Sequence, residues 1–293
     1  MIVSAPRHEP TPGAGIAGTP LVPDVQSGRL RRLIVDAAGN GSLVLAPVPP
    51  KGLRQRLTGF DVEGGRLLDT IAAEGGQQAY VLESSESRLT LHYTFAEDPG
   101  AYLPEWVWHP PANALSDASP ELARFAREGI AARGNDAVRR LATHVTSIFC
   151  YGAGEGRFTD GEASVPLVCS TTRGTCIDVH TYFSAALRAA GIDAAYIAGI
   201  FVAEGAHEAT DMHCWVAVRL GDVVEEWDLS HALITGRRPR PGLTEIPGRR
   251  LALSSGRGIH FPATRRSSPL SHLALPCDMG GRVLSARSRI ETL

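Results

Sequence analysis

The clearest alternation of apolar and polar residues lies at positions 89–95. Four apolar side chains alternate there with three polar ones, the period-2 pattern of a strand with one buried face: Leu89, Thr90, Leu91, His92, Tyr93, Thr94 and Phe95. Two shorter apolar runs, 33–35 and 43–45, flank the turn-forming sequence Gly39-Asn40-Gly41 and predict a β-hairpin. Residues 29–112 are therefore predicted to form an all-β domain.

The pattern changes to helical spacing after a proline-rich stretch. Ser119-Pro120-Glu121 predicts a helix start, because it combines a capping side chain, a first-turn proline and a first-turn acid. Asn135 is the predicted cap of a second helix, whose apolar residues recur at helical spacing up to Phe149. Gly174-Thr175-Cys176 opens a third helix that stops at Gly191. This third helix is apolar on nearly every face and is therefore predicted to be central.

Strand-like segments follow this helix at 195–202, 213–220 and 223–229. Helices followed by strands, rather than alternating with them, predict an α+β fold for residues 113–293. Residues 1–28 are rich in proline and glycine without apolar periodicity, which predicts a flexible leader. We expect the all-β region 29–112 to fold as its own unit against the core and to contribute no catalytic residue.

Charge and hydropathy argue against two classes of function. The 293 residues carry 29 Lys+Arg against 31 Asp+Glu, a net charge of −2, which argues against binding nucleic acid or a membrane surface through bulk electrostatics. No window approaches the roughly 18 apolar residues of a membrane span, and residues 1–28 lack the apolar run of a secretory signal. We therefore expect a cytoplasmic protein whose five cysteines are thiols, ligands or packing residues rather than a disulfide scaffold.

Cys176 stands at the predicted start of the central helix. The positive end of the helix dipole lowers the pKa of a thiol there and favours the thiolate, which is the nucleophilic form. Position alone leaves a second interpretation open, since a cysteine beside a helix cap can also be a small buried packing residue. The residues on the two following strands favour the interpretation of Cys176 as a nucleophile.

The two strands after the helix bring a histidine and a carboxylate together. Gly221-Asp222 fits a two-residue hairpin loop that pairs its two flanking residues. Continued along the ladder, this register places Asp228 opposite Trp215, on the same face as His213 and diagonal to it. A diagonal separation of about 7–8 Å is within reach of an imidazole and a carboxylate. Cys214 falls on the opposite face and is disfavoured as the nucleophile.

Cys176, His213 and Asp228 form the predicted catalytic triad, with a thiolate nucleophile, a histidine that acts as base and later as acid, and an orienting carboxylate. Zinc is an alternative, because five potential ligands lie within a modest stretch: Cys169, Cys176, His207, His213 and Cys214. Their spacings fit no standard ligand pair, which disfavours a zinc site. Three further polar residues are interpreted as structural: Asp178, His180 and Tyr182. His231 follows the sheet and is interpreted as a loop histidine, with a position at the border of the pocket as the alternative.

The sequence around the triad resembles the core of transglutaminase-like proteins. The resemblance rests on G-T-C-I-D at 174–178, L-R-A-A-G-I at 187–192, H-C-W-V at 213–216 and W-D at 227–228. In that family G-x-C opens the central helix, LR-x-x-GI ends it, H-x-W begins the next strand, and an aspartate one strand later completes the triad. Trp227 stands directly before Asp228, whereas family members usually place this tryptophan a few residues earlier. The resemblance covers residues 113–235 and, through bacterial members with a β-rich domain before the core, extends loosely to residues 29–112.

The resemblance implies a papain-like core and acyl-transfer chemistry on an amide bond. We expect hydrolysis of a peptide or protein amide, with an amide-forming acyltransferase and a catalytically silent binding module of the same fold as alternatives. No metal or organic cofactor is expected, because a thiolate and an imidazole together supply the nucleophile and the proton shuttle. The sequence leaves open the substrate, the second donor to the oxyanion and the oligomeric state.

Overall fold

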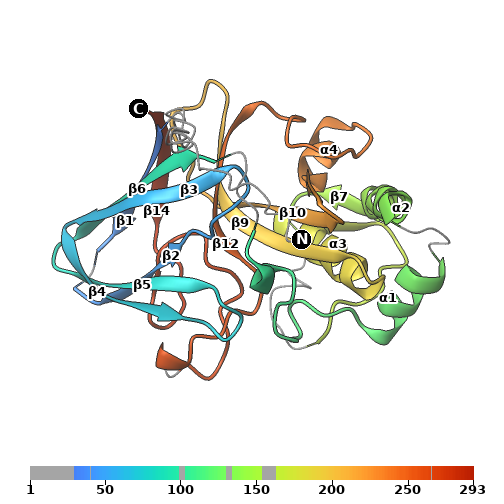
Figure 1. Ribbon diagram of the computed structural model, residues 1–293, viewed down its shortest axis with the longest axis horizontal. Coiled ribbons are helices and arrows are strands. Elements are labelled where there is room, and N and C mark those ends of the chain that lie inside the picture. The colour runs from blue at the N-terminus through green and yellow to red at the C-terminus, as the bar shows by residue number, and fades with distance from the viewer. Residues whose placement is uncertain (1–29, 40, 99–102, 130–133, 154–162, 265) are drawn as a thin grey trace, which may run out of the picture.

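The computed structural model describes residues 30–39, 41–98, 103–129, 134–153, 163–264 and 266–293. The predicted leader, residues 1–28, lies outside this range. Figure 1 shows a strand-rich part at the left and a helix-rich part at the right, with the long strand β9 (Asp193–Ala203) running between them. The chain therefore has the predicted mixed composition, and most strands of the first part precede the helices of the second.

The N-terminal strands form two four-stranded antiparallel sheets. One sheet has the order β14-β1-β6-β3 and the other has the order β13-β2-β5-β4. The strands contributed by the N-terminal region are β1 (Leu30–Ala38), β2 (Leu43–Val48), β3 (Gln55–Glu63), β4 (Gly65–Ala72), β5 (Gln78–Ser84) and β6 (Arg88–Glu97). The four apolar residues of the alternating stretch in β6 are at most 1% exposed, as its period-2 pattern predicts.

The predicted β-hairpin of residues 33–45 is wrong in its pairing. Both strands exist, but β1 pairs with β6 and β14, whereas β2 pairs with β5 and β13 in the other sheet. Both strands are apolar in continuous runs, so each is buried in the middle of its own sheet, and the chain crosses from one sheet to the other between them. A turn signal between two apolar runs does not specify which partner each run takes.

The C-terminal strands complete the N-terminal sheets. β13 (Cys277–Asp278) pairs with β2, and β14 (Ala286–Thr292) pairs with β1 along its whole length. The expectation that residues 29–112 fold as their own unit is therefore wrong, because both of their sheets include strands from the end of the chain. Apolar residues of β9 and of β12 (Gly248–Ser255) also lie in the core between these sheets.

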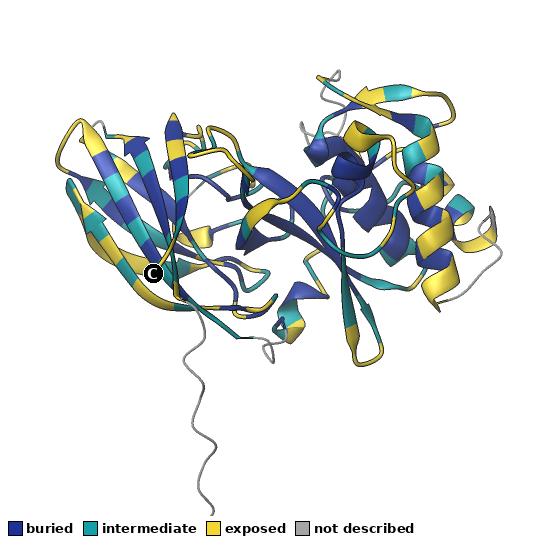
Figure 2. Ribbon diagram, turned by 90° about the horizontal axis from the view of Figure 1, so that it is seen from above, coloured by how far each residue is buried: buried dark blue, intermediate teal, exposed yellow. Residues whose placement is uncertain are grey.

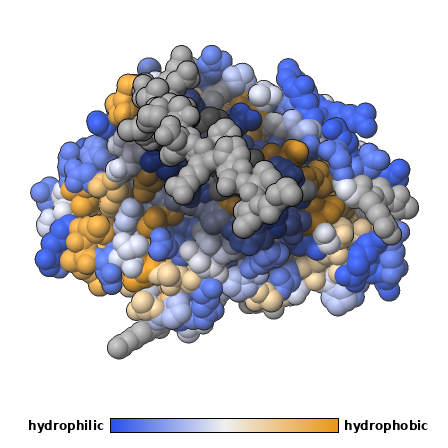
Figure 3. Space-filling model, in the orientation of Figure 1, coloured by the Kyte–Doolittle hydropathy of each residue, from blue (hydrophilic) through white to orange (hydrophobic). Residues whose placement is uncertain are grey.

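One edge of the strand-rich part exposes apolar side chains. Leu67 and Leu68 of the edge strand β4 are 46% and 42% exposed, and Figure 3 shows hydrophobic surface over this end of the molecule. Arg66 and Asp69 flank the two leucines on the same strand. Charged residues on an edge strand disfavour pairing with another chain.

Among the described residues, the helix-rich part consists of the buried helix α3 (Cys176–Ala189) and three further α-helices. The three are α1 (Pro120–Arg124), which continues as a π-helical turn, α2 (Gly134–Ile148) and α4 (Leu229–Thr235), with a short parallel pair, β7 (Phe149–Tyr151) and β8 (Thr172–Gly174). Figure 2 shows that α3 is buried over almost its whole length, as expected from its apolar faces. Among the described residues, no helix is both long and apolar enough to cross a membrane.

Two of the predicted helix starts are observed and one is shifted. Ser119 accepts a hydrogen bond from the backbone N–H of Leu122 at the start of α1, and Thr175 caps α3. Asn135 does not cap α2, because that helix already begins at Gly134; its side chain instead bonds Glu225 and Arg139.

The central sheet has the order β11-β10-β9-β12 and carries α3 on one face. β10 (His213–Leu220) and β11 (Val223–Trp227) form the predicted hairpin, with Leu220 opposite Val223 and Val216 opposite Trp227. β11 ends at Trp227, two residues earlier than predicted. Trp227 is fully buried and packs edge-on against Phe183 of α3, which anchors the end of this strand.

Gln55 joins the strand-rich part to the central sheet. Its side-chain amide donates to the backbone oxygen of Ala252 at 2.8 Å and its oxygen accepts from the backbone N–H of Ala252 at 2.9 Å. Ala252 belongs to β12, so this pair of hydrogen bonds fixes one edge of the central sheet.

We predict that Gln55→Leu lowers the free energy of unfolding by about 1–3 kcal/mol, because it leaves both backbone groups of Ala252 buried without partners. Urea denaturation measures this loss. Gln78→Leu, at an exposed position of β5, is the control and should change stability by no more than about 0.5 kcal/mol. Equal stability of the two variants would show that the Gln55 amide does not hold the sheets together.

Candidate active site

The cap of α3 fixes the position of Cys176. Thr175 and Asp178 form a capping box, in which the Thr175 backbone N–H donates to the Asp178 carboxylate at 2.8 Å. Asp178 therefore has the structural role predicted for it. Cys176 is the first residue of the helix, where the backbone N–H groups have no acceptor within the helix and the helix dipole is positive.

His213 and Asp228 are in direct contact. The Nε2 atom of His213 lies 2.7 Å from Oδ2 of Asp228, and both side chains are buried. Asp228 is not a strand residue, as the sequence predicted, but the cap of α4. Its other oxygen, Oδ1, accepts from the Ser230 hydroxyl at 2.8 Å and from the His231 backbone N–H at 3.1 Å. The start of α4 thus orients the carboxylate toward His213.

His213 also interacts with the Cys176 side chain. Because Nε2 faces Asp228, the ring nitrogen that remains for the sulfur is Nδ1. Burial alone would lower the pKa of His213, but the hydrogen bonds to Asp228 and then to Cys176 outweigh it and raise the pKa to about 9. The structure therefore brings the three residues of the predicted triad together, with the histidine between the other two.

Cys176 has a strongly lowered pKa. A hydrogen bond with the Cys214 thiol lowers it most, burial opposes this effect, and the hydrogen bond with His213 lowers it further, to about 5. The pKa of Cys214 is raised well above its usual range, first by burial. At neutral pH the site therefore favours a Cys176 thiolate beside a His213 imidazolium, with Cys214 as a protonated donor.

Cys214 lies on the face of β10 opposite to His213, as predicted, yet it also contributes to the site. Cys214 lies in one buried cluster with Cys176 and faces α3 together with Val216 and Val218. His213 lies on the other face but is the first residue of β10. Both neighbours nevertheless interact with the Cys176 sulfur and lower the pKa of its thiol.

His180 is a buried neutral histidine. Its Nε2 accepts from the backbone N–H of Leu229 at 2.9 Å, and its Nδ1 lies 3.6 Å from the Cys214 sulfur. Burial lowers its pKa to about 4. Tyr182 is fully buried and packs edge-on against Phe149. Both residues have the structural roles interpreted from the sequence.

The triad region does not suit a metal ion. Ligand atoms of His213, Asp228 and His231 lie within 4.8 Å of one another. However, a terminal nitrogen of Arg250 lies 2.7 Å from Nδ1 of His231 and 3.4 Å from Oδ2 of Asp228. A guanidinium is permanently charged and repels a second cation at this distance. Cys169 and His207, which the zinc alternative also requires, are exposed.

Two residues near the site, Tyr151 and Arg250, belong to no sequence motif that could have identified them. Tyr151 of β7 pairs with Gly174, two residues before Cys176, and is 41% exposed. Burial and then the nearby Cys176 raise its pKa to about 12, so its hydroxyl stays protonated. Arg250 comes from β12, in a C-terminal stretch without a motif.

Comparison with known proteins supports the class of this fold. Residues 121–227 match the model of the transglutaminase-like superfamily, and this segment of the chain is a transglutaminase-like core. The match includes Cys176 and His213 and ends one residue before Asp228. No curated protein matches the chain.

Solved structures resemble the chain in fold at low sequence identity. A "Putative Cysteine Protease" from Cytophaga hutchinsonii is 13% identical, with a TM-score of 0.54 over 92% of both chains. The periplasmic domain of TgpA from Pseudomonas aeruginosa bound to ethylmercury is 15% identical, with a TM-score of 0.42 over 74% of this chain and 94% of that domain. The first similarity shows a shared fold that includes the strand-rich part.

We predict that iodoacetamide at pH 6 modifies Cys176 before Cys150 and Cys169. Cys150 and Cys169 are exposed, whereas Cys176 is only 7% exposed. Exposure alone would make the first two react faster, but the larger thiolate fraction of Cys176 makes it the faster one to be modified. Peptide-level mass spectrometry gives the three rates in one sample. Faster modification of the exposed pair would show that Cys176 is an ordinary packing thiol.

Proposed function

We propose that this protein is a thiol-dependent amide hydrolase of the cysteine-peptidase type, which acts on a peptide or protein through Cys176, His213 and Asp228. The observation that carries the proposal is the 2.7 Å contact of the His213 ring with the Asp228 carboxylate, together with the interaction of His213 with Cys176 that lowers the pKa of the thiol. The transglutaminase-like core and the fold shared with a protein described as a cysteine protease are consistent with it.

The geometry supplies each group that acyl transfer requires. The Cys176 thiolate attacks the amide carbonyl, and the His213 imidazolium donates its proton to the leaving nitrogen. Water then attacks the thioester, with His213 accepting a proton from it. Asp228 holds the imidazole in orientation and stabilises its charged form.

The developing oxyanion needs two donors. The backbone N–H of Cys176 lies in the first turn of α3, and such a donor is worth on the order of 3–4 kcal/mol in the transition state. The protonated hydroxyl of Tyr151 is our candidate for the second donor, because this residue lies beside Gly174 near the mouth of the site.

Amide formation is the second candidate reaction. An amine that replaces water in the second step gives a new amide through the same triad, and no group in the site distinguishes the two acceptors. A silent binding module is disfavoured, because the site keeps its nucleophile, its imidazole and its carboxylate in contact. The cytoplasmic location stays a prediction.

We predict that a peptide library incubated with the protein shows mass changes that Cys176→Ala abolishes. Gain of water indicates hydrolysis, and mass gain only in the presence of an added amine indicates transfer. With a substrate in hand, kcat/KM should follow a bell-shaped pH profile with limbs near the pKa values of Cys176 and His213, about 5 and about 9. Below the first limb the thiolate is protonated, and above the second the leaving nitrogen has no acid. No turnover of any peptide would contradict the proposed reaction.

We also predict that Asp228→Asn folds but loses turnover by a factor on the order of 10⁴, the loss seen when an orienting carboxylate is replaced. Glu226→Gln is the control, because Glu226 lies opposite Ala217 on β11 and accepts from the Trp215 indole at 2.9 Å, a bond that the amide oxygen can keep. If Glu226→Gln abolished activity and Asp228→Asn retained it, a different carboxylate would orient His213.

A further inference from the structure

Arg250 lies behind the triad on the face of the central sheet that is opposite to α3. It is paired with Phe201 in the β9–β12 ladder, and its side chain is 8% exposed. It lies outside residues 121–227, the segment that matches the family model. Arg250 therefore contacts the triad from a strand outside the segment that matches the family model.

One nitrogen of Arg250 bridges two residues of the site. Nη2 lies 2.7 Å from Nδ1 of His231 and 3.4 Å from Oδ2 of Asp228, the oxygen that also binds His213. Nδ1 of His231 also lies 3.0 Å from the same oxygen, and the side-chain hydrogen bond of His231 is among the contacts that lower the pKa of the Asp228 carboxyl. Oδ2 of Asp228 thus lies between the imidazole that it orients and a fixed guanidinium.

Aromatic rings complete this arrangement. The Arg250 guanidinium lies 4.2 Å from the centre of the Phe201 ring, which contacts the rings of both His213 and His231. The two histidine rings are stacked with their centres 4.5 Å apart. A shift of Arg250 would therefore be transmitted to His213 through Asp228 and through the ring stack.

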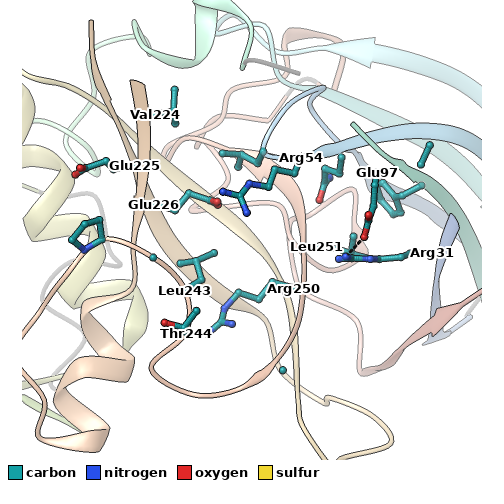
Figure 4. A pocket seen from close by; sticks show the side chains of 17 residues that line it. Arg31, Arg54, Glu97, Val224, Glu225, Glu226, Leu243, Thr244, Arg250 and Leu251 are labelled. Atoms are coloured by element: carbon teal, nitrogen blue, oxygen red, sulfur yellow. Dashed lines mark hydrogen bonds and ion pairs between the residues drawn. The ribbon is translucent and has the colours of Figure 1, made fainter. Parts of the chain in front are cut away.

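Arg250 also borders a cavity between the strand-rich part and the central sheet. The cavity has a volume of about 730 Å³, and Arg54, Glu226 and Leu243 are among its lining residues. Figure 4 shows the Arg250 side chain at this cavity, with Arg54 and Glu226 across from it. Among the described residues, nothing accepts a hydrogen bond from the buried Nε of Arg250. Burying a guanidinium with one donor unused is costly, so packing alone does not explain an arginine here.

We propose that Arg250 is a positioning residue that holds the Asp228 carboxylate, and through it the His213 imidazole, in line with the Cys176 sulfur. This inference rests on the proposed function, because it assigns a role within the same triad. The charged and titratable groups that face Asp228 are His213 from β10, His180 from α3, His231 from α4 and Arg250 from β12. Arg250 is the member of this group that carries a permanent charge.

The test is Arg250→Ala with chemical rescue by free guanidinium. Truncation leaves a void that opens to the cavity, so a guanidinium ion can enter and occupy the place of the lost group. The readout is the rate of Cys176 alkylation by iodoacetamide at pH 6, followed by peptide-level mass spectrometry, because it needs no substrate. We expect a loss of about 10- to 100-fold, the scale of a misplacement near 1 Å, and recovery in guanidinium at tens of millimolar, far below denaturing concentrations.

Arg249→Ala is the matched control, since Arg249 is the exposed neighbour on the same strand. It should react at the wild-type rate and should not respond to guanidinium. If Arg250 had only a structural role, Arg250→Ala would lower the midpoint of thermal unfolding, and guanidinium would not restore the alkylation rate. A folded Arg250→Ala protein that reacts at the wild-type rate would overturn the inference, as would a loss that guanidinium does not restore.

Arg250→Lys serves as the second variant if Arg250→Ala does not fold. It keeps the charge, but the lysine side chain is one bond shorter than that of arginine and places its ammonium short of the position of Nη2. The midpoint of the alkylation pH profile should therefore move above the wild-type value, whereas an unchanged midpoint would overturn the inference. Failure of the proposed function is distinguishable, because it leaves wild-type peptide turnover absent while the alkylation profiles of the variants still differ. Failure of the inference alone leaves wild-type turnover intact and the profiles equal.

Discussion

The buried Asp228 carboxylate is the group on which the candidate site depends. A carboxylate without water is stable only if hydrogen bonds and opposite charge replace its hydration. Asp228 receives both, from the His213 ring, the Ser230 hydroxyl, the His231 backbone and Arg250. Burial alone would raise its pKa, yet the side-chain hydrogen bonds with His213 and then with His231 hold it well below the usual range. The carboxylate therefore stays charged, and a charged carboxylate is what keeps an imidazolium beside the Cys176 thiolate.

The elements around Asp228 come from distant parts of the chain. α3 supplies Cys176, β10 supplies His213, the turn into α4 supplies Asp228, and β12 supplies Arg250. β12 is in turn fixed to the strand-rich part by Gln55, and β13 and β14 return the end of the chain to the N-terminal sheets. The strand-rich part therefore contributes no triad residue, but it holds the strand that carries Arg250.

Periodicity and local rules in the sequence predicted most of the path from helix to triad. The capped start at Thr175, the stop at Gly191 and the two-residue loop at 221–222 each follow from short-range chemistry, and each is observed. The loop fixes the strand register, and the register brings Asp228 to His213. Such features can be read from sequence because their causes lie within a few residues.

The features that could not be predicted depend on long-range contacts. The hairpin proposed for residues 33–45 failed because two apolar strands joined by a turn can belong to different sheets. The contribution of Cys214 to the site was not predicted, because strand alternation places it and His213 on opposite faces, and both nevertheless interact with Cys176. Arg250 reaches Asp228 from 22 residues away in sequence, and nothing in its neighbourhood marks it. In each case the partner is chosen by tertiary packing.

The most direct test of the central claim is a pH titration of the Cys176 thiolate by ultraviolet difference absorbance between the protein and its Cys176→Ser variant. The account predicts that thiolate absorbance rises with a midpoint near pH 5 and is fully developed at neutral pH, since the hydrogen bonds from Cys214 and His213 lower the pKa of Cys176 to about 5. A thiolate that appears only near pH 9, the ordinary value for a cysteine, would contradict it.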